Sequence, residues 1–165
     1  MGLAIALLTI SDTRSLADDA SGDHLLGQLQ AAGHHLQERS LCADDRYQIR
    51  AELSRWIADP AVDVVITSGG TGLTGRDGTP EAVGPLLDKT IEGFGELFRV
   101  LSFEHIGTST LQSRCLAGVA NGTFIFVLPG SLDAVSTAWD RLIRDQLDAD
   151  TRPCNLAQLR TRLRE

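Results

Sequence analysis

Glycines, hydroxyl groups and a carboxylate are concentrated in one loop of this chain of 165 residues. The β-branched run Val64–Thr67 leads into Ser68-Gly69-Gly70-Thr71-Gly72, and Asp77 follows just before a helix signal at Thr79-Pro80-Glu81. Glycines let the backbone approach oxygen atoms closely, and free N–H groups at a helix start favour negative charge. A carboxylate inside such a loop would repel phosphate unless a metal ion lay between them. The spacing therefore predicts nucleotide or phosphate chemistry with a divalent cation.

Two common phosphate-binding motifs are excluded for this loop. The chain has no Gly-Lys-Ser/Thr and its only lysine is Lys89, so the loop is not a Walker A motif. No G-x-G-x-x-G follows the first apolar run, which excludes the dinucleotide fingerprint. Positive charge for a phosphate must then come from arginines such as Arg14, Arg46, Arg76 and Arg114.

Alternating strand and helix patterns position this loop. Strands are predicted at Leu3–Ile10, His34–Leu41, Val62–Thr67, Cys115–Ala120 and Thr123–Leu128. Helices are predicted from the N-caps Ser21 (to about Ala32), Asp45 (to Pro60), Thr79 and Ser131 (through Ile143), and over Glu92–His105. The dipeptide Asn121-Gly122 predicts a two-residue hairpin between the last two strands.

This order of elements predicts an α/β fold: a three-layer α/β/α sandwich whose sheet is mainly parallel, with one antiparallel strand at the hairpin. Residues 1–165 are interpreted as a single domain. Its C-terminal tail, residues 151–165, is polar and rich in arginine, and we expect it to pack on a neighbouring subunit or to fray.

Several loops should meet at one edge of such a sheet, because ligands of open α/β sheets bind outside the carboxyl ends of the parallel strands. The loops that leave those ends carry Ser11-Asp12-Thr13, Asp44-Asp45 and the glycine-rich segment, and Pro129-Gly130-Ser131 also follows a strand and opens a helix. We expect these loops to form one site.

Composition limits the classes of partner. The net charge of −7 argues against general nucleic-acid binding, and no apolar run approaches the roughly 20 residues of a membrane-spanning helix. Residues 1–10 lack a basic n-region and are interpreted as a core strand rather than a signal peptide. Cys42, Cys115 and Cys154 are far apart, so neither a disulfide framework nor a zinc site is predicted, and a cytoplasmic location is expected.

Read together, Thr67–Gly72 and Arg76–Ala82 resemble the signature of the molybdenum-cofactor biosynthesis domain shared by MoaB, MogA and gephyrin-type proteins. Further segments are similar to the MoaB branch of this family: Asp18–Gly22, Gly93–Glu96, Phe103–Arg114, Leu128–Ser131 and Thr151–Asn155. The resemblance covers nearly the whole chain.

The resemblance implies an adenylyltransferase reaction that requires Mg²⁺. The terminal phosphate of molybdopterin attacks the α-phosphate of ATP and releases pyrophosphate, and the activated product later receives molybdate or tungstate. The resemblance also implies a homotrimer or a hexamer built as a dimer of trimers, with other molybdenum cofactor biosynthesis proteins as further partners. No nucleic acid and no membrane are expected as partners.

The family pattern places two acids on Asp44 and Asp77, which it implies are catalytic and hold Mg²⁺ or its water shell. It implies that Gly69, Gly70, Thr71 and Gly72 bind the nucleotide phosphates and that Ser109, Ser113, Arg114 and Ser131 serve the pterin or its phosphate. Ser68, Pro129 and Gly130 complete the expected ligand-binding set.

Each assignment has a structural alternative. Asp77-Gly78 is also typical of a turn, and Asp45 is favoured as a helix cap over a catalytic group. Asp12 could end its strand, and Arg114 could form an ordinary ion pair. His34-His35 lack the spacing of metal ligands and are interpreted as structural or solvent-exposed.

The alternative function is a non-catalytic protein that binds molybdopterin or nucleotide in the same pathway. Some members of the MoaB branch depart from the two acids, whereas this chain keeps both. Gly78 stands where the family more often has a β-branched residue, which would loosen the turn.

Overall fold

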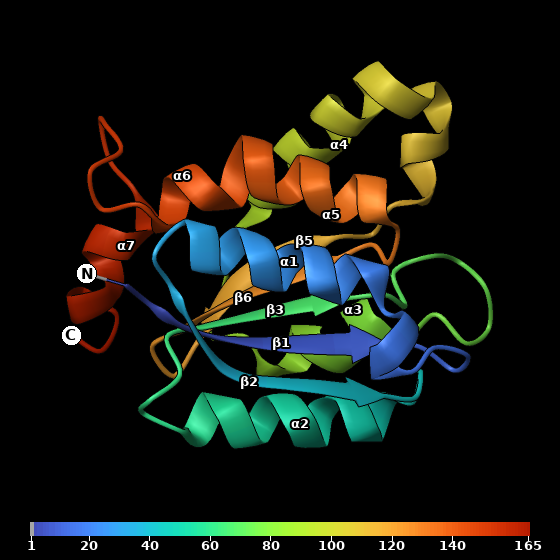
Figure 1. Cartoon of the computed structure of the whole chain (residues 1–165), viewed down its shortest axis with the longest axis horizontal. Coiled ribbons are helices and arrows are strands. Elements are labelled where there is room, and N and C mark those ends of the chain that lie inside the picture. Colours follow the sequence, from blue (N-terminus) through green and yellow to red (C-terminus); the bar gives the residue numbers. More distant parts are fainter. Residues whose placement is uncertain (1) are drawn as a thin grey trace.

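Six strands form one sheet in the computed structural model, which describes residues 2–165 (Figure 1). The strands are β1 (Ala4–Ile10), β2 (His35–Cys42), β3 (Val64–Ser68), β4 (Lys89–Thr90), β5 (Leu116–Ala120) and β6 (Thr123–Leu128). Their order across the sheet is β2-β1-β3-β6-β5-β4. Neighbours among β2, β1, β3 and β6 pair in parallel, whereas β5 runs antiparallel to both β6 and β4. The predicted fold class is confirmed, and the short edge strand β4 is an addition to it.

Helices cover both faces of the sheet, as Figure 1 shows. They are α1 (Ala20–Ala31), α2 (Arg46–Ala58), α3 (Thr79–Val83), α4 (Glu92–Ile106), α5 (Leu132–Ala138), α6 (Arg144–Leu147) and α7 (Leu156–Leu159). A π-helical segment, Trp139–Ile143, joins α5 to α6.

Successive side chains of a strand point to opposite faces of the sheet, and this alternation divides the core into two layers. In β1, Ile5 and Leu7 face a cluster that includes side chains of α1, α4 and α5, whereas Ala6 and Leu8 face a cluster formed with α2 and α3. Both faces of β1 are therefore buried, which explains why its sequence is a continuous apolar run.

Local signals fix the hairpin and two of the helix starts. Asn121 and Gly122 have φ values of 48° and 80°, and positive φ at both central residues is the feature of a type I′ turn. The carboxylate of Asp45 accepts hydrogen bonds from the backbone N–H groups of residues 47 and 48, and the hydroxyl of Ser131 accepts one from Ala134. These three predictions are confirmed.

Two predicted N-caps are wrong. Helix α1 is capped by Asp19, whose buried carboxylate accepts from the N–H of Gly22, and Ser21 lies inside the helix. Helix α3 begins after Gly78, and Thr79 is its first residue rather than its cap. In both cases the hydroxyl is bonded instead to a carbonyl of a neighbouring loop.

The C-terminal tail packs partly on its own chain, where the sequence predicted packing on a neighbouring subunit or fraying. Asn155 is buried and caps α7 by accepting from the N–H of Gln158, and Leu156, Ala157 and Leu163 pack against the core on the α1 side. These three side chains thus pack within the same chain, whereas Leu159 is 44% exposed. Among the helices of residues 2–165, none is both long and apolar enough to cross a membrane.

Candidate functional site

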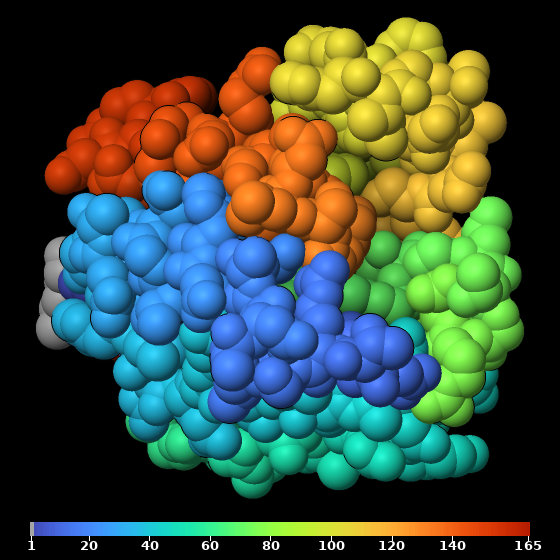
Figure 2. All heavy atoms as spheres, turned by 45° about the vertical axis from the view of Figure 1, so that its right-hand side comes forward, coloured from blue at the N-terminus to red at the C-terminus, as the bar shows by residue number. Residues whose placement is uncertain are grey.

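A pocket of about 550 Å³ lies at the carboxyl edge of the parallel strands. It is lined by Ile10, Ser11, Asp12, Thr13, Arg14, Asp44, Gly69, Gly70, Thr71, Gly72, Asp77, Ser109, Gln112, Ser113, Pro129, Gly130 and Ser131. Figure 2 brings this edge forward and shows the loops after β1, β3 and β6 meeting there, with the gold segment after α4 beside them. The expected convergence of loops is confirmed.

The glycine-rich loop has a backbone that only glycine adopts without strain. Gly69 and Gly70 have φ values of 111° and 67°. A Cβ on Gly69 would collide with the carbonyl oxygen of Ile10, and a Cβ on Gly70 would lie 2.9 Å from Oδ1 of Asp44. The loop therefore passes tightly over the end of β1 and leaves the Asp44 carboxylate directly beside the backbone.

Thr79 anchors the glycine-rich loop to the start of α3. Its hydroxyl donates to the carbonyl of Gly69 over 2.9 Å, and its N–H donates to the carbonyl of Gly70 over 3.0 Å. Thr79 is fully buried, so these bonds are shielded from water. The hydroxyl thus secures the loop rather than capping the helix.

Asp77 forms the predicted turn interaction and also lines the pocket. Its Oδ2 accepts from the N–H and the hydroxyl of Thr74, at 2.9 and 2.6 Å, which is a local turn interaction. These bonds lower the pKa of Asp77, most strongly through the Thr74 hydroxyl, so the residue is a carboxylate at neutral pH. Asp77 also lines the pocket beside Gly72.

Asp44 carries an oxygen without a partner. Its Oδ1 is buried and has no hydrogen-bond donor within the described residues. Burial raises the pKa of Asp44, and the charges of Asp77 and Asp12 raise it further, against a hydrogen bond from the Gly78 backbone. A buried acceptor between like charges is a position where a cation would be favourable.

Asp12 links three loops, a role that sequence reasoning missed. Its carboxylate accepts from Nε and Nη2 of Arg76 and from the N–H of Asp44, each over 2.9 Å. The bonds from Arg76 lower the pKa of Asp12 to about 2. Nothing in the local sequence signals these contacts, because they join positions 32 and 64 residues apart.

The β6 loop is fastened to the β1 side of the pocket. Both the hydroxyl of Ser21 and Nη1 of Arg14 donate to the carbonyl of Gly130, over 2.8 and 3.1 Å. Gly130 packs closely on Gly69, since a Cβ at Gly130 would lie 3.2 Å from the Gly69 Cα. Ser21 is the second site-forming residue that sequence reasoning missed.

Most predicted site residues line the pocket, and two do not. Ser68 is buried within β3. Arg114 lies behind the glycine-rich loop, where it donates to the carbonyls of Gly72 and Asp77 and pairs with Glu81. The ion-pair alternative for Arg114 therefore describes its pairing with Glu81, and its other hydrogen bonds support the loop from outside the pocket. By contrast, Ser113 lines the pocket with a buried hydroxyl that lacks a partner.

The donor set of the pocket suits a magnesium ion that also contacts a bound phosphate. Within residues 2–165, no three His, Cys, Asp or Glu side chains are grouped so that they could hold a metal ion by themselves. Mg²⁺ in nucleotide sites is commonly held by one or two carboxylates together with substrate phosphates and water. Asp44 and Asp77, with the free Oδ1 of Asp44, fit that pattern.

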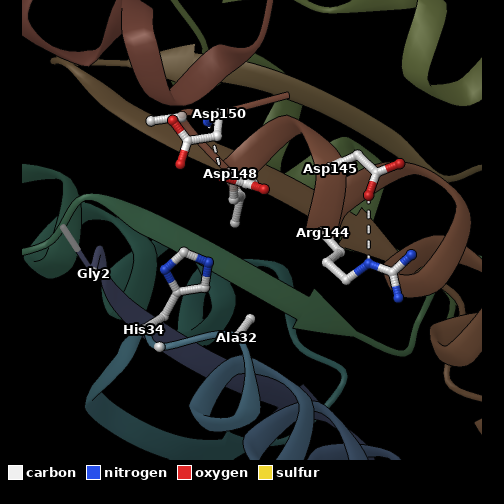
Figure 3. A pocket seen from close by; sticks show the side chains of 10 residues that line it. Gly2, Ala32, His34, Arg144, Asp145, Asp148 and Asp150 are labelled. Atoms are coloured by element: carbon white, nitrogen blue, oxygen red, sulfur yellow. Dashed lines mark hydrogen bonds and ion pairs between the residues drawn. The ribbon is translucent and has the colours of Figure 1, made fainter. Parts of the chain in front are cut away.

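A second cavity, of about 400 Å³, lies at the opposite edge of the sheet (Figure 3). His34 lines it and is 8% exposed; its Nδ1 accepts from the N–H of Leu3, and burial lowers its pKa. Asp148 and Asp150 lie across the cavity from the ring in Figure 3. This arrangement agrees with a structural histidine, and the cavity lacks the glycine-rich backbone of the first.

Comparison with known proteins relates the whole fold to one family. A family model described as a probable molybdopterin binding domain matches residues 6–149. Molybdenum cofactor biosynthesis protein B of Escherichia coli K12 is 57% identical over 151 residues, which cover 92% of this chain and 89% of that protein. A crystal structure of molybdenum cofactor biosynthesis protein B has a TM-score of 0.89 at 38% identity, covering 99% and 97% of the two chains. The tungsten cofactor synthesizing protein MoaB from Pyrococcus furiosus has a TM-score of 0.80 at 31% identity, covering 99% and 98%.

Proposed function

Because the chain belongs to the family of molybdopterin binding domains that includes MoaB and MogA, we propose that it adenylylates molybdopterin with Mg-ATP. The process in which it acts is molybdenum cofactor biosynthesis, for which its 57% identical relative is named. The finer assignment, to an adenylyltransferase, rests on the chemistry of the pocket.

The observation that carries this proposal is the buried, unpartnered Oδ1 of Asp44 beside the glycine-rich loop. A buried acceptor without a donor costs free energy in the ligand-free protein, on the order of 1–3 kcal/mol. Such a cost is typical of positions that await a ligand. Asp77 lines the same pocket and stays ionised, so a cation there would meet two carboxylates.

Asp44 and Asp77 would hold Mg²⁺, which when bound neutralises charge on the reacting phosphates. Among the described residues that line the pocket, Asp12, Asp44 and Asp77 are acidic and Arg14 is the one cationic side chain. A polyphosphate would be repelled by this set without a cation. Although Asp12 is paired with Arg76, the charges of Asp44 and Asp77 support a requirement for a metal ion.

The protein's own contribution is to position two anions. The backbone of Gly69 to Gly72 would bind the ATP phosphates, and Ser109, Ser113 and Ser131 would hold the pterin or its phosphate. A phosphate oxygen of molybdopterin then attacks the α-phosphorus of ATP, a new P–O–P bond forms, and the bond to pyrophosphate breaks. Alignment of the reactants and stabilisation of the developing charge account for most of the catalysis in such transfers.

The test is turnover of purified protein with ATP, Mg²⁺ and molybdopterin, followed by detection of adenylylated pterin and pyrophosphate. We expect Asp77→Asn to lower the rate at least about 100-fold, because the amide retains the turn but removes the charge. The matched control is Asp59→Asn, since Asp59 also accepts a local backbone hydrogen bond but lies at the far end of α2. The control should keep wild-type turnover.

One observation favours the non-catalytic alternative: Oδ2 of Asp77 is already occupied by Thr74 in a turn. In that case Asp77 would only shape the loop of a protein that binds molybdopterin or nucleotide. Tight pterin binding by wild-type protein without any turnover, and no effect of Asp77→Asn, would establish this alternative and exclude the enzyme.

A further inference from the structure

We infer that Asp12 is a positioning residue that couples the loop of Asp44 to the loop of Asp77. The inference rests on the proposed metal site, because it concerns how the two carboxylates of that site are kept together. It assigns a function to a residue that sequence reasoning treats as the end of a strand.

The coupling is a set of three hydrogen bonds to one carboxylate. Oδ1 of Asp12 accepts from the N–H of Asp44 and from Nη2 of Arg76, and Oδ2 accepts from Nε of Arg76. Arg76 directly precedes Asp77 in the chain. Asp12 therefore binds the main chain of Asp44 and the side chain of Arg76, the residue next to Asp77.

Such a device is needed because the two loops repel one another. Asp44 and Asp77 line the same pocket, and both carry carboxylates. Without a cation, that repulsion favours separation of the loops. The bidentate pair between Asp12 and Arg76 opposes the separation, since Arg–carboxylate pairs of this geometry fix both distance and direction.

Stability alone does not explain these contacts. Arg76 and Asp12 have side-chain exposures of 64% and 36%. An exposed ion pair stabilises a fold by at most about 1 kcal/mol. Residues that orient metal ligands, by contrast, commonly change metal affinity or activity about 10–100-fold when they are replaced. Loss of Asp12 should therefore affect the site far more than the fold.

Three variants separate the contacts. Asp12→Ala removes all of them, and Asp12→Asn keeps an acceptor for the Asp44 N–H but loses the charged pair. The double variant Asp12→Arg with Arg76→Asp restores a pair of reversed polarity without an acceptor for Asp44. The readouts are the affinity for Mn²⁺ in the presence of ATP, by calorimetry, and amide hydrogen exchange of Asp44 and of residues 73–78, by NMR.

We expect Asp12→Ala to weaken Mn²⁺ binding about 10–100-fold and to speed exchange at Asp44 and in residues 73–78 about 10-fold. In Asp12→Asn only residues 73–78 should exchange faster. The double variant should restore protection of residues 73–78 but not of Asp44. A uniformly destabilised protein would exchange faster at Asp44 and in residues 73–78 alike, in every variant.

Glu38→Gln is the matched control. Glu38 also forms a bidentate pair with an exposed arginine, Arg55, and its pKa is likewise lowered to about 2 by that arginine. The pair lies on β2 and α2, outside the pocket, and its loss should leave Mn²⁺ binding unchanged.

Two failures can be distinguished. Wild-type protein that binds no Mn²⁺ with ATP contradicts the proposed metal site, and exchange alone then decides whether Asp12 couples the loops. Wild-type protein that binds, together with an Asp12→Ala variant whose affinity and exchange match it, overturns the role of Asp12.

Discussion

Asp44 and Asp77 contribute in opposite directions to the stability of the ligand-free protein. Burial raises the pKa of Asp44, so folding disfavours its charged form. Hydrogen bonds from Thr74 lower the pKa of Asp77, so folding favours its charged form. At pH 7 both groups are ionised in the unfolded chain, and the Asp44 charge destabilises the fold whereas the Asp77 charge stabilises it.

Replacing each acid by its amide should therefore change stability with opposite sign. We expect Asp44→Asn to raise the free energy of unfolding at pH 7 by about 1 kcal/mol, because an unpaired buried charge is removed. Asp77→Asn should lower it by a similar amount, because charge-assisted hydrogen bonds become neutral ones. Urea denaturation without ligands measures both. If Asp44→Asn instead lowered the free energy of unfolding, the Asp44 charge would not be an unfavourable unpaired charge in the fold.

At the scale of elements, strand ends and glycine conformations determine where the pocket forms. The parallel strands β1, β2, β3 and β6 end at one edge, and every lining residue from Ile10 to Thr71 lies in or near such an end. Gly69 then turns sharply over β1, with a φ value of 111°. The geometry of the glycine-rich loop thus depends on the position of the end of β1 as well as on the loop's own residues.

Replacing Gly69 should disturb this geometry more than replacing a glycine elsewhere in the same loop. Gly69→Ala combines a positive φ with a collision against the Ile10 carbonyl, and we expect it to cost about 1–3 kcal/mol of unfolding free energy. Gly75→Ala is the control, because a Cβ there meets no atom within 4 Å. Thermal unfolding of both variants tests this, and equal melting temperatures would contradict it.

Local patterns in the sequence predict helices, strands and turns. They do not predict contacts between residues that are far apart in the chain. The strands, the Asp45 cap and the Asn121-Gly122 hairpin follow from neighbours along the chain. The cap at Asp19 and the bond from Thr79 to Gly69 depend on which loop packs beside each residue. The pocket edge could be predicted from topology, whereas the pairing of Asp12 with Arg76 required the packed fold.

At the scale of the whole molecule, α4 exposes an apolar ridge. It consists of Leu97, Val100, Phe103, Ile106 and Leu111, whose side chains are 47–78% exposed on α4 and the turns that follow it. In Figure 1, α4 stands out from the body of the molecule. An apolar hollow of about 350 Å³ between α4 and the α5–α6 segment adjoins it and shares Leu97. Single chains rarely expose such patches.

We propose that a second copy of the chain covers this ridge, in the trimer or hexamer that the family resemblance implies. A ridge and a hollow on one chain are the two unlike surfaces that a closed head-to-tail ring requires. Phe103→Glu should shift the molar mass measured by light scattering toward that of a monomer. Tyr47→Glu is the control, because Tyr47 is 72% exposed but isolated on α2. Wild-type protein that is already monomeric would contradict the proposal.

The bond between Arg14 and Gly130 spans 116 positions of the chain and closes the pocket across β1 and β6. Its consequence concerns the order of events in folding. Structures dominated by such remote contacts fold slowly, because the entropy of closing long loops must be overcome before the contacts form. During synthesis the pocket therefore stays incomplete until residue 130 is available.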